Sequence, residues 1–215
     1  MNKGELTRQR IIAKAAPIFN QRGYAGCSMQ DIQSATGLEK GGLYRHFASK
    51  EELAIESFRY AWKSAVKIRT GDLDHIIGAV EQLRYFIRRF AEKPSAMPGG
   101  CPLMNTAIEA DDGNPALRQL ARQAIRDWQL RLCGIVEQGI RQGEIRKAVS
   151  ARRVANTIIA TLEGALMISR LEGSKDAMRD AQASLEILLA EIIPGRPRPA
   201  APLSKAARQS PLQNR

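Results

Sequence analysis

Apolar residues recur at intervals of three and four along most of this chain, and no stretch alternates as a strand does. This periodicity predicts helices, because side chains three and four residues apart share one helix face. We expect an all-α fold of about nine helices, in residues 7–24, 28–36, 40–47, 49–67, 72–92, 102–109, 115–142, 150–171 and 174–193. The apolar face of the helix at 72–92 comprises Leu73, Ile76, Ile77, Val80, Leu83 and Ile87.

Residues 28–53 have the pattern of two short helices joined by a tight turn and followed by a third helix. Ser28 can cap the first helix with Asp31 as its capping-box partner, and Gly37 can end it. Leu43 and Phe47, four residues apart, predict that one face of the second helix is buried. The other face carries hydrogen-bond donors and few acids, which suits phosphates and base edges. The segment therefore predicts a helix-turn-helix whose partner is double-stranded DNA.

The candidate DNA contacts lie at three helix starts and along the second short helix. Lys40 begins that helix, where side chains enter the groove, so it is a candidate for a guanine edge or a nearby phosphate. Gly41 and Gly42 would each cost about 1 kcal/mol relative to alanine in a helix interior. Either packing or close approach to DNA must therefore require them. The full candidate set is Ser28, Met29, Gln30, Lys40, Gly41, Gly42, Tyr44, Arg45, His46 and Lys50.

The first quarter of the chain resembles the TetR family of bacterial transcriptional regulators. The resemblance covers roughly residues 6–53 and rests on T-R-Q-R-I-I-A-K-A-A-P-I-F-N-Q-R-G-Y, S-M-Q-D-I and G-L-E-K-G-G-L-Y-R-H-F-A-S-K-E-E-L. It implies that Tyr44 and His46 contact phosphates, although a half-buried ring is the alternative for Tyr44. Arg45 is equally compatible with a base contact and with solvation. Pro17 within the first helix and Cys27 in place of a usual threonine depart from the family pattern.

The resemblance also implies a division of the chain and a mode of action. Residues 1–48 would form the helix-turn-helix domain, and residues 49–193 a helical ligand-binding and dimerisation domain. A repressor of this family binds a palindromic operator as a homodimer and is released by a small-molecule inducer. The last two long helices carry apolar stripes, which either pack inside the chain or pair with a second copy; they comprise Val154, Ile158, Thr161, Ala165, Ile168, Leu185, Leu188, Leu189 and Ile192.

Residues 194–215 form a basic tail rich in proline, alanine and arginine, with five Arg/Lys and no acidic residue. We expect the tail to be disordered. It is either a solvated extension or a source of non-specific attraction to phosphates. The net charge of the whole chain is +11, but residues 1–60 carry only +3, from nine Lys/Arg and six Asp/Glu. The positive charge of the DNA-binding segment must therefore depend on position rather than amount.

The ligand-binding residues are less sharply indicated, and core packing is the alternative for each. The candidates are Trp62, Phe86, Cys101, Met104, Asn105, Trp128, Glu163 and Met167. Cys101 follows Pro-Gly-Gly and begins a helix, a position that lowers the pKa of a thiol. It is thus a candidate sensor of electrophiles or oxidants, or else a small residue in a tight corner.

Other functional classes find little support in the sequence. The two histidines and the lack of an H-E-x-x-H, a G-x-S-x-G or a phosphate-binding loop argue against an enzyme. We expect no metal and no cofactor. No signal peptide is recognisable, and the apolar runs look too short to cross a membrane, so a soluble cytoplasmic protein is expected. A transcriptional activator, an architectural DNA-binding protein and a helical interaction protein without DNA binding remain as alternatives.

Overall fold

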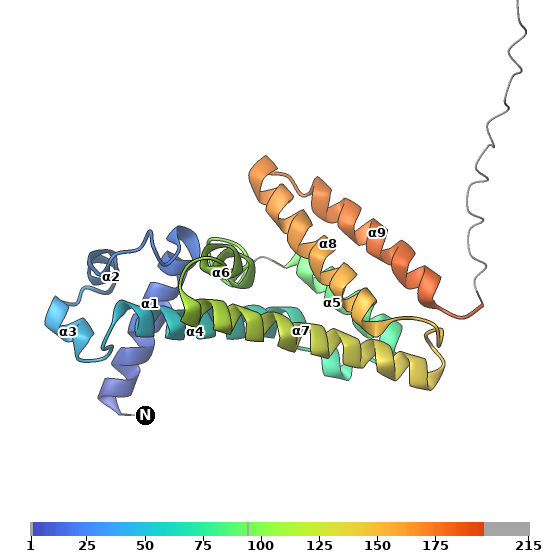
Figure 1. Ribbon diagram of the computed structural model, residues 1–215, viewed down its shortest axis with the longest axis horizontal. Helices are drawn as coiled ribbons and strands as arrows, with labels where there is room; N and C mark the ends of the chain where they lie inside the picture. The colour runs from blue at the N-terminus through green and yellow to red at the C-terminus, as the bar shows by residue number, and fades with distance from the viewer. Residues whose placement is uncertain (1, 94, 196–215) are drawn as a thin grey trace, which may run out of the picture.

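The computed structural model describes residues 2–93 and 95–195, and these residues form helices joined by turns and loops, with no strand among them (Figure 1). The all-α prediction is therefore confirmed. The helices are α1 (Lys3–Arg22), α2 (Met29–Thr36), α3 (Lys40–Tyr44), α4 (Lys50–Thr70), η1 (Leu73–His75), α5 (Ala79–Glu92), α6 (Pro102–Ala110), α7 (Pro115–Gln142), α8 (Ala151–Glu172) and α9 (Asp176–Ile192). The tail prediction falls on residues outside this range, apart from Pro194 and Gly195.

The prediction of one helix across residues 72–92 was wrong. The short 3₁₀ helix η1 ends at His75, and α5 begins only at Ala79. Gly78 between them has φ +89°, which a helix cannot accommodate. The carboxylate of Glu144 accepts hydrogen bonds from the backbone N–H of Ala79 (2.7 Å) and Val80 (3.4 Å), and so caps α5 from a distant part of the chain. Ile77, predicted to be buried, is 93% exposed.

Two main hydrophobic cores lie along the molecule, and a small third cluster comprises Ala54, Ala110 and Leu117. The smaller core joins α1, α2, α3 and the start of α4, with Ile11, Ile12, Ala15, Cys27, Ile32, Leu43, Phe47 and Leu53 buried. The larger core joins α4 to α9 and includes Phe58, Leu83, Phe86, Leu132, Ile158 and Leu185. Because α4 supplies Leu53 to one core and Phe58 to the other, a single continuous helix connects them. Figure 1 shows α2 and α3 at one end of the molecule and α8 and α9 towards the other.

The apolar stripes of α8 and α9 pack mainly inside the chain. Val154, Ile158 and Ala165 of α8, with Leu185, Leu189 and Ile192 of α9, are buried in the larger core. Ile168, a member of the predicted α8 stripe, is exposed instead, and so are Met167 (45%) and Leu171 (81%) on α8 and Ile187 (63%) on α9. Met167 and Leu171 line a surface groove with α6 and the end of α1, whereas Ile168 and Ile187 line none of the described pockets.

Helix α8 is the one helix in the described part of the chain that is long and apolar enough to cross a membrane. The expectation that no apolar run had this length was therefore wrong. A core helix of a soluble protein meets the same criterion. In α8, 33% of the apolar stretch is buried, and Val154, Ile158 and Leu162 pack into the larger core.

Candidate nucleic-acid interface

The start of α2 is held by the capping box that the sequence predicts. Ser28 Oγ accepts a hydrogen bond from the backbone N–H of Asp31 (3.1 Å), and Asp31 Oδ2 accepts one from the backbone N–H of Ser28 (2.7 Å). Arg22 pairs with the other carboxylate oxygen of Asp31 at 2.7 Å. The hydrogen bonds from Ser28, and then the charge of Arg22, lower the pKa of Asp31. Backbone N–H groups in the first turn of a helix have no acceptor within the helix, and such groups bind phosphates in other proteins.

The second short helix, α3, is shorter than predicted. It ends at Tyr44, and Arg45 and His46 form the turn that follows. Leu43 and Phe47 are buried in the smaller core as predicted, and the Phe47 backbone N–H still donates to the Leu43 carbonyl (3.1 Å). The buried pair thus fixes both the helix and the turn, even though regular helix geometry stops between them.

Most of the predicted DNA contacts are exposed around this helix. Lys40, Gly41 and Arg45 are exposed, as are Ser28 and Gln30 at the start of α2. Tyr44 is 43% exposed, and Lys40 Nζ lies 5.9 Å from the centre of its ring. About two fifths of the residue is therefore exposed, which leaves a phosphate contact open to Tyr44 and is equally compatible with the half-buried ring.

Three other candidates differ in their surroundings. The side chain of Met29 packs against the smaller core, so only its backbone faces outward as a possible phosphate contact. His46 is half-buried in the turn after α3. Lys50 Nζ lies 4.4 Å from the centre of the Tyr24 ring, which holds the ammonium group at the start of α4.

The two glycines of α3 have no packing reason within the chain. A β-carbon at Gly41 would meet no atom within 4 Å. At Gly42 it would lie 3.7 Å from Leu38 Cβ, an ordinary van der Waals contact. Of the two explanations that the sequence left open, packing inside the chain is therefore excluded for Gly41.

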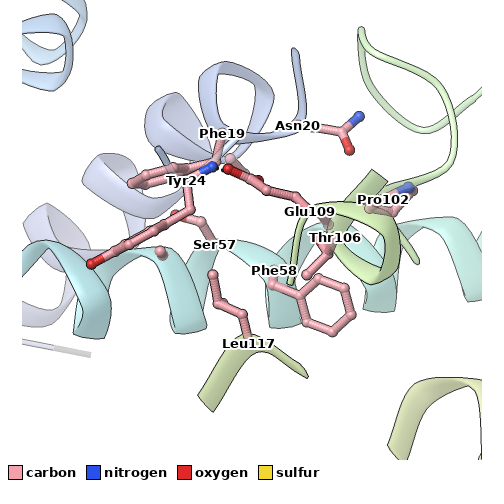
Figure 2. A pocket seen from close by; sticks show the side chains of 12 residues that line it. Phe19, Asn20, Tyr24, Ser57, Phe58, Pro102, Thr106, Glu109 and Leu117 are labelled. Atoms are coloured by element: carbon pink, nitrogen blue, oxygen red, sulfur yellow. Dashed lines mark hydrogen bonds between the residues drawn. The ribbon is translucent and has the colours of Figure 1, made fainter. Parts of the chain in front are cut away.

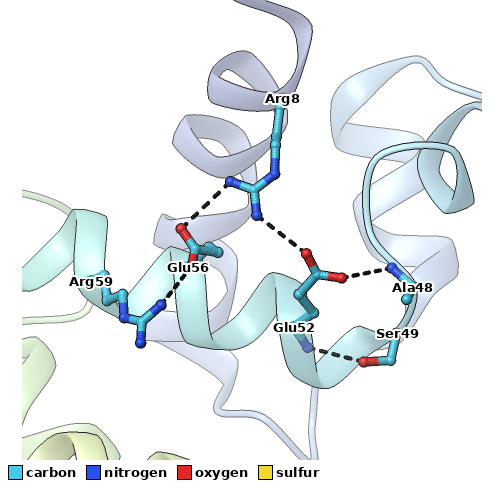
Figure 3. A network of polar contacts seen from close by, with 6 residues as sticks. All are labelled: Arg8, Ala48, Ser49, Glu52, Glu56 and Arg59. Atoms are coloured by element: carbon cyan, nitrogen blue, oxygen red, sulfur yellow. Dashed lines mark hydrogen bonds and ion pairs between the residues drawn. The ribbon is translucent and has the colours of Figure 1, made fainter. Parts of the chain in front are cut away.

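An ion-pair network joins α1 to the start of α4 (Figure 3). Arg8 of α1 pairs with Glu52 (3.2 Å) and Glu56 (3.5 Å), and Arg59 pairs with Glu56 at 2.7 Å. The Arg8 guanidinium also lies 4.7 Å from the centre of the Phe47 ring. Arg8 was not predicted from the sequence. Glu52 and Glu56 lie four residues apart on one face of α4, and two like charges so placed are a signal that could have indicated a basic partner.

A second contact, also missed from the sequence, joins α6 to the connection between α1 and α2. Figure 2 shows Glu109 of α6 beside Tyr24. The Glu109 carboxylate accepts hydrogen bonds from the backbone N–H of Tyr24 (2.7 Å) and Ala25 (2.8 Å). Gly23 allows this approach, since a β-carbon there would lie 2.6 Å from Glu109 Oε2. The helix-turn-helix is thereby tied to the helical body.

Two asparagines reinforce the same junction. Asn20 of α1 is buried, and its Nδ2 donates to the carbonyl of Pro98 (2.7 Å). Asn105 of α6 donates from its own Nδ2 to the carbonyls of Asn20 (2.9 Å) and Gly99 (2.8 Å). Asn105, predicted as a ligand contact, thus has its donor group occupied in joining α6 to α1.

The other predicted ligand residues fall into separate places. Trp62, Phe86 and Trp128 pack edge to face, with ring centres of Trp62 and Phe86 at 5.4 and 5.7 Å from Trp128. Met104 and Glu163 line a cavity between α6, α7 and α8. Met167 is exposed on α8 and lines a surface groove between α1, α6 and α8 together with Met104 and Asn105. The structure therefore brings three of the eight residues to this groove but does not gather all eight into one site.

Of the two alternatives for Cys101, the structure favours a small residue in a tight corner over a reactive thiolate. Cys101 does occupy the N-cap position of α6, but it has no exposed surface and its Sγ–H donates to Glu163 Oε1 (2.9 Å). Burial, and then the negative charge of Glu163, raise the pKa of Cys101 to about 12. Desolvation therefore outweighs the favourable position at a helix start. Cys27 and Cys133 also have raised thiol pKa values, in each case mainly through burial.

Comparison with known proteins identifies the family. The family model described as "Bacterial regulatory proteins, tetR family" matches residues 11–56, and that described as "Tetracyclin repressor-like, C-terminal domain" matches residues 79–185. A TetR transcriptional regulator from Chloroflexus aurantiacus is 43% identical, with a TM-score of 0.85 over 90% of this chain and 98% of its own. The chain belongs to the TetR family. It is therefore a DNA-binding transcriptional regulator of the helix-turn-helix type.

Further relatives agree with this placement. A TetR-family transcriptional regulator from Cytophaga hutchinsonii is 37% identical, with a TM-score of 0.85 over 91% of this chain and 99% of its own. The HTH-type transcriptional repressor DhaR of Mycobacterium sp. (strain GP1) is 24% identical over 172 residues, 80% of this chain and 86% of its own. These TetR-family relatives are regulators rather than enzymes.

Proposed function

We propose that this TetR-family regulator is a repressor that binds a palindromic operator as a homodimer and is released from it by a small molecule. The observation that carries the proposal is the outer face of α3. Exposed Lys40, Tyr44 and Arg45 surround a glycine whose missing side chain nothing in the chain explains. A helix with donors and free space at its surface suits the major groove.

The proposed contacts divide by chemistry. Lys40, at the first residue of α3, would reach a guanine edge or an adjacent phosphate, and Gly41 would allow the backbone to approach the bases. Gly42 would leave room for the bases in the same way, and Arg45 would either read a base edge or remain solvated. The remaining candidates would hold phosphates from the start of α2, from α3 and the turn after it, and from the start of α4. These are Ser28, Met29, Gln30, Tyr44, His46 and Lys50.

Exposed apolar side chains on α8 and α9 support the homodimer. Ile168 and Leu171 of α8 and Ile187 of α9 are exposed on two helices that pack against each other, and large apolar side chains left exposed on a soluble protein can mark an interface. Gly164, one helical turn before Ile168, has free space around it, which allows close helix approach. Two-fold pairing would place two copies of α3 about 34–36 Å apart, at successive major grooves. Such a regulator acts on the genome and so in the cytoplasm.

The cavity between α6, α7 and α8 supports release by a small molecule. It holds about 440 Å³ and is lined largely by apolar side chains, with Glu163 and Met104 among them. This volume lies in the range of small-molecule sites. A ligand that binds the free form more tightly than the DNA-bound form would release the operator.

Selection of random double-stranded DNA on the purified full-length protein at about 150 mM salt tests the proposal, since affinity for phosphates depends on salt. The expected result is an enriched pseudo-palindrome with half-sites about one helical turn apart. Sedimentation at micromolar concentration should give a dimer. Binding without sequence enrichment, or a monomer, would contradict the proposal and favour an architectural role.

Two variants then test the residue assignments on the selected operator. Lys40→Ala should lower specific affinity by about tenfold or more and leave non-specific binding nearly unchanged, because a good base contact contributes about 1–3 kcal/mol. Tyr44→Phe should weaken binding to all sequences alike. Lys147→Ala removes an exposed lysine from the loop between α7 and α8 and serves as the control. Unchanged operator affinity in both test variants would refute the assignments.

A further inference from the structure

The cavity between α6, α7 and α8 has an uneven lining. Its walls are apolar over most of their extent and comprise Leu103, Met104, Ala107, Ala121, Ile125 and Ile159. The polar groups are confined to Glu163 on α8 and to Asp111, Arg118 and Arg122. The cavity is partly open to solvent. A molecule that fills it must be mainly apolar, with a few polar atoms at fixed places.

Glu163 is the unusual member of this lining. Its Oε1 accepts a hydrogen bond from the Cys101 thiol, but its Oε2 is buried and accepts none from any described residue. Burial raises the pKa of Glu163, although the Cys101 hydrogen bond and the charge of Arg69 oppose the shift. A buried acceptor without a donor is rare in native proteins and points to a missing partner. The terminal torsion of a glutamate is soft, so a small rotation can turn Oε2 towards a donor in the cavity.

The charges around the cavity restrict the ligand further. Arg118 and Arg122 lie on its lining, and Arg118 is paired with Asp111 at 4.0 Å. An ammonium ligand would meet the field of two guanidinium groups, and Arg69 already compensates part of the Glu163 charge. A carboxylate ligand would bring a second negative charge towards Glu163 and still leave Oε2 without a donor. An uncharged hydroxyl avoids both the repulsion by the guanidinium groups and the repulsion by Glu163, and it can donate a hydrogen bond to Oε2.

We propose that this cavity binds an uncharged, mainly apolar molecule bearing one hydroxyl group, a phenol or an alcohol, and that the hydroxyl donates its hydrogen bond to Glu163 Oε2. The apolar part of the molecule lies against Leu103, Met104 and Ile125. The proposal rests on the proposed function only in treating this molecule as the inducer. The binding chemistry itself is independent of DNA.

Four probes of one shape test the chemistry: 4-butylphenol, butylbenzene, 4-butylbenzoate and 4-butylbenzylamine, titrated calorimetrically into the full-length protein. The phenol should bind about tenfold tighter than butylbenzene, the difference made by pairing one buried acceptor. Benzoate and ammonium probes should bind more weakly than the phenol. Equal affinity for phenol and butylbenzene, tighter binding of either charged probe, or no binding by any probe would overturn the proposal.

Variants locate the effect within the cavity. Glu163→Leu should abolish the preference for the phenol and retain affinity for butylbenzene, whereas Glu172→Leu, at an exposed glutamate of the same helix, should preserve the preference. Ala107→Trp places a ring at an exposed position of the lining and should block all four probes even if Glu163→Leu does not fold. Undiminished binding to Ala107→Trp would overturn the location.

Release of the selected operator by 4-butylphenol is measured separately. If the phenol preference is present and the operator stays bound, the cavity chemistry stands and the inducer role fails. If no operator is selected at all, the proposed function fails while the calorimetric result is unaffected. The two failures are therefore distinguishable.

Discussion

Substitution of Gly41 by alanine should change the stability of the protein and its affinity for DNA in opposite directions. The new β-carbon would meet no atom of the chain within 4 Å. Alanine is favoured over glycine in a helix interior by about 0.8–1 kcal/mol. Because α3 has only five residues, we expect Gly41→Ala to raise the free energy of unfolding by about half that value. For a chain of this size, each kcal/mol raises the melting temperature by about 2–4 °C.

The effect on DNA binding should have the opposite sign. If α3 approaches the bases as proposed, a methyl group at Gly41 occupies space that the operator needs, and the affinity should fall about tenfold, or about 1.4 kcal/mol. Thermal unfolding measures the first effect, and fluorescence anisotropy with the selected operator measures the second. A more stable protein with weaker operator binding is the expected pair of results.

A matched control is available in Gly134 on α7. It is exposed, and a β-carbon there also meets nothing within 4 Å, so Gly134→Ala should stabilise the protein without affecting the operator. Lower stability of Gly41→Ala would mean that packing, which the structure excludes, requires the glycine after all. Unchanged operator affinity would mean that α3 does not approach DNA at this residue.

Three other predictions follow from individual contacts. Glu109→Ala should lower the melting temperature by about 2–4 °C and weaken operator binding, because two charge-assisted hydrogen bonds to the α1–α2 connection are lost at an exposed site; wild-type values in both assays would refute the role. Glu163→Gln should flatten the pH dependence of the free energy of unfolding. Burial raises the pKa of Glu163 in the folded protein, so above about pH 4.3 the unfolded chain releases this proton first and the folded protein loses stability as the pH rises. Identical urea-unfolding profiles of the variant and the wild type from acid to neutral pH would contradict this. Iodoacetamide at about pH 7.5 should label half-buried Cys133 before Cys101, as followed by mass spectrometry, and preferential labelling of Cys101 would show that its thiol is accessible.

The parts of the fold that were predictable are those with local causes. Ser28 caps α2 through a residue three positions away, and Asn114 caps α7 in the same manner. Leu43 and Phe47 are buried because a four-residue repeat places them on one face. Such signals depend only on neighbours in the sequence, so they can be read without the tertiary structure.

The features that were missed depend on residues distant in the sequence. Glu144 caps α5 from about 65 positions away, and Glu109 holds the backbone of Tyr24 and Ala25 from about 85. No local pattern marks a carboxylate for such a partner. At Cys101 the local feature, a helix start, was predicted correctly. The burial that raises the pKa of the thiol, against the effect of the helix start, depends on distant residues and was not predicted.

Helix α6 connects these observations, because it contacts both the cavity and the DNA-binding segment. Met104 lies on the cavity lining, while Asn105 and Glu109, one and five residues later, hold α1 and the α1–α2 connection. One helix of nine residues, about 14 Å long, thus has one face against each. Coupling between two sites requires an element whose position both of them affect. If ligand binding and operator binding are coupled in this regulator, the Glu109 hydrogen bonds connect the two sites. Glu109→Ala should therefore reduce the effect of the ligand on operator affinity without changing the affinity for the ligand itself.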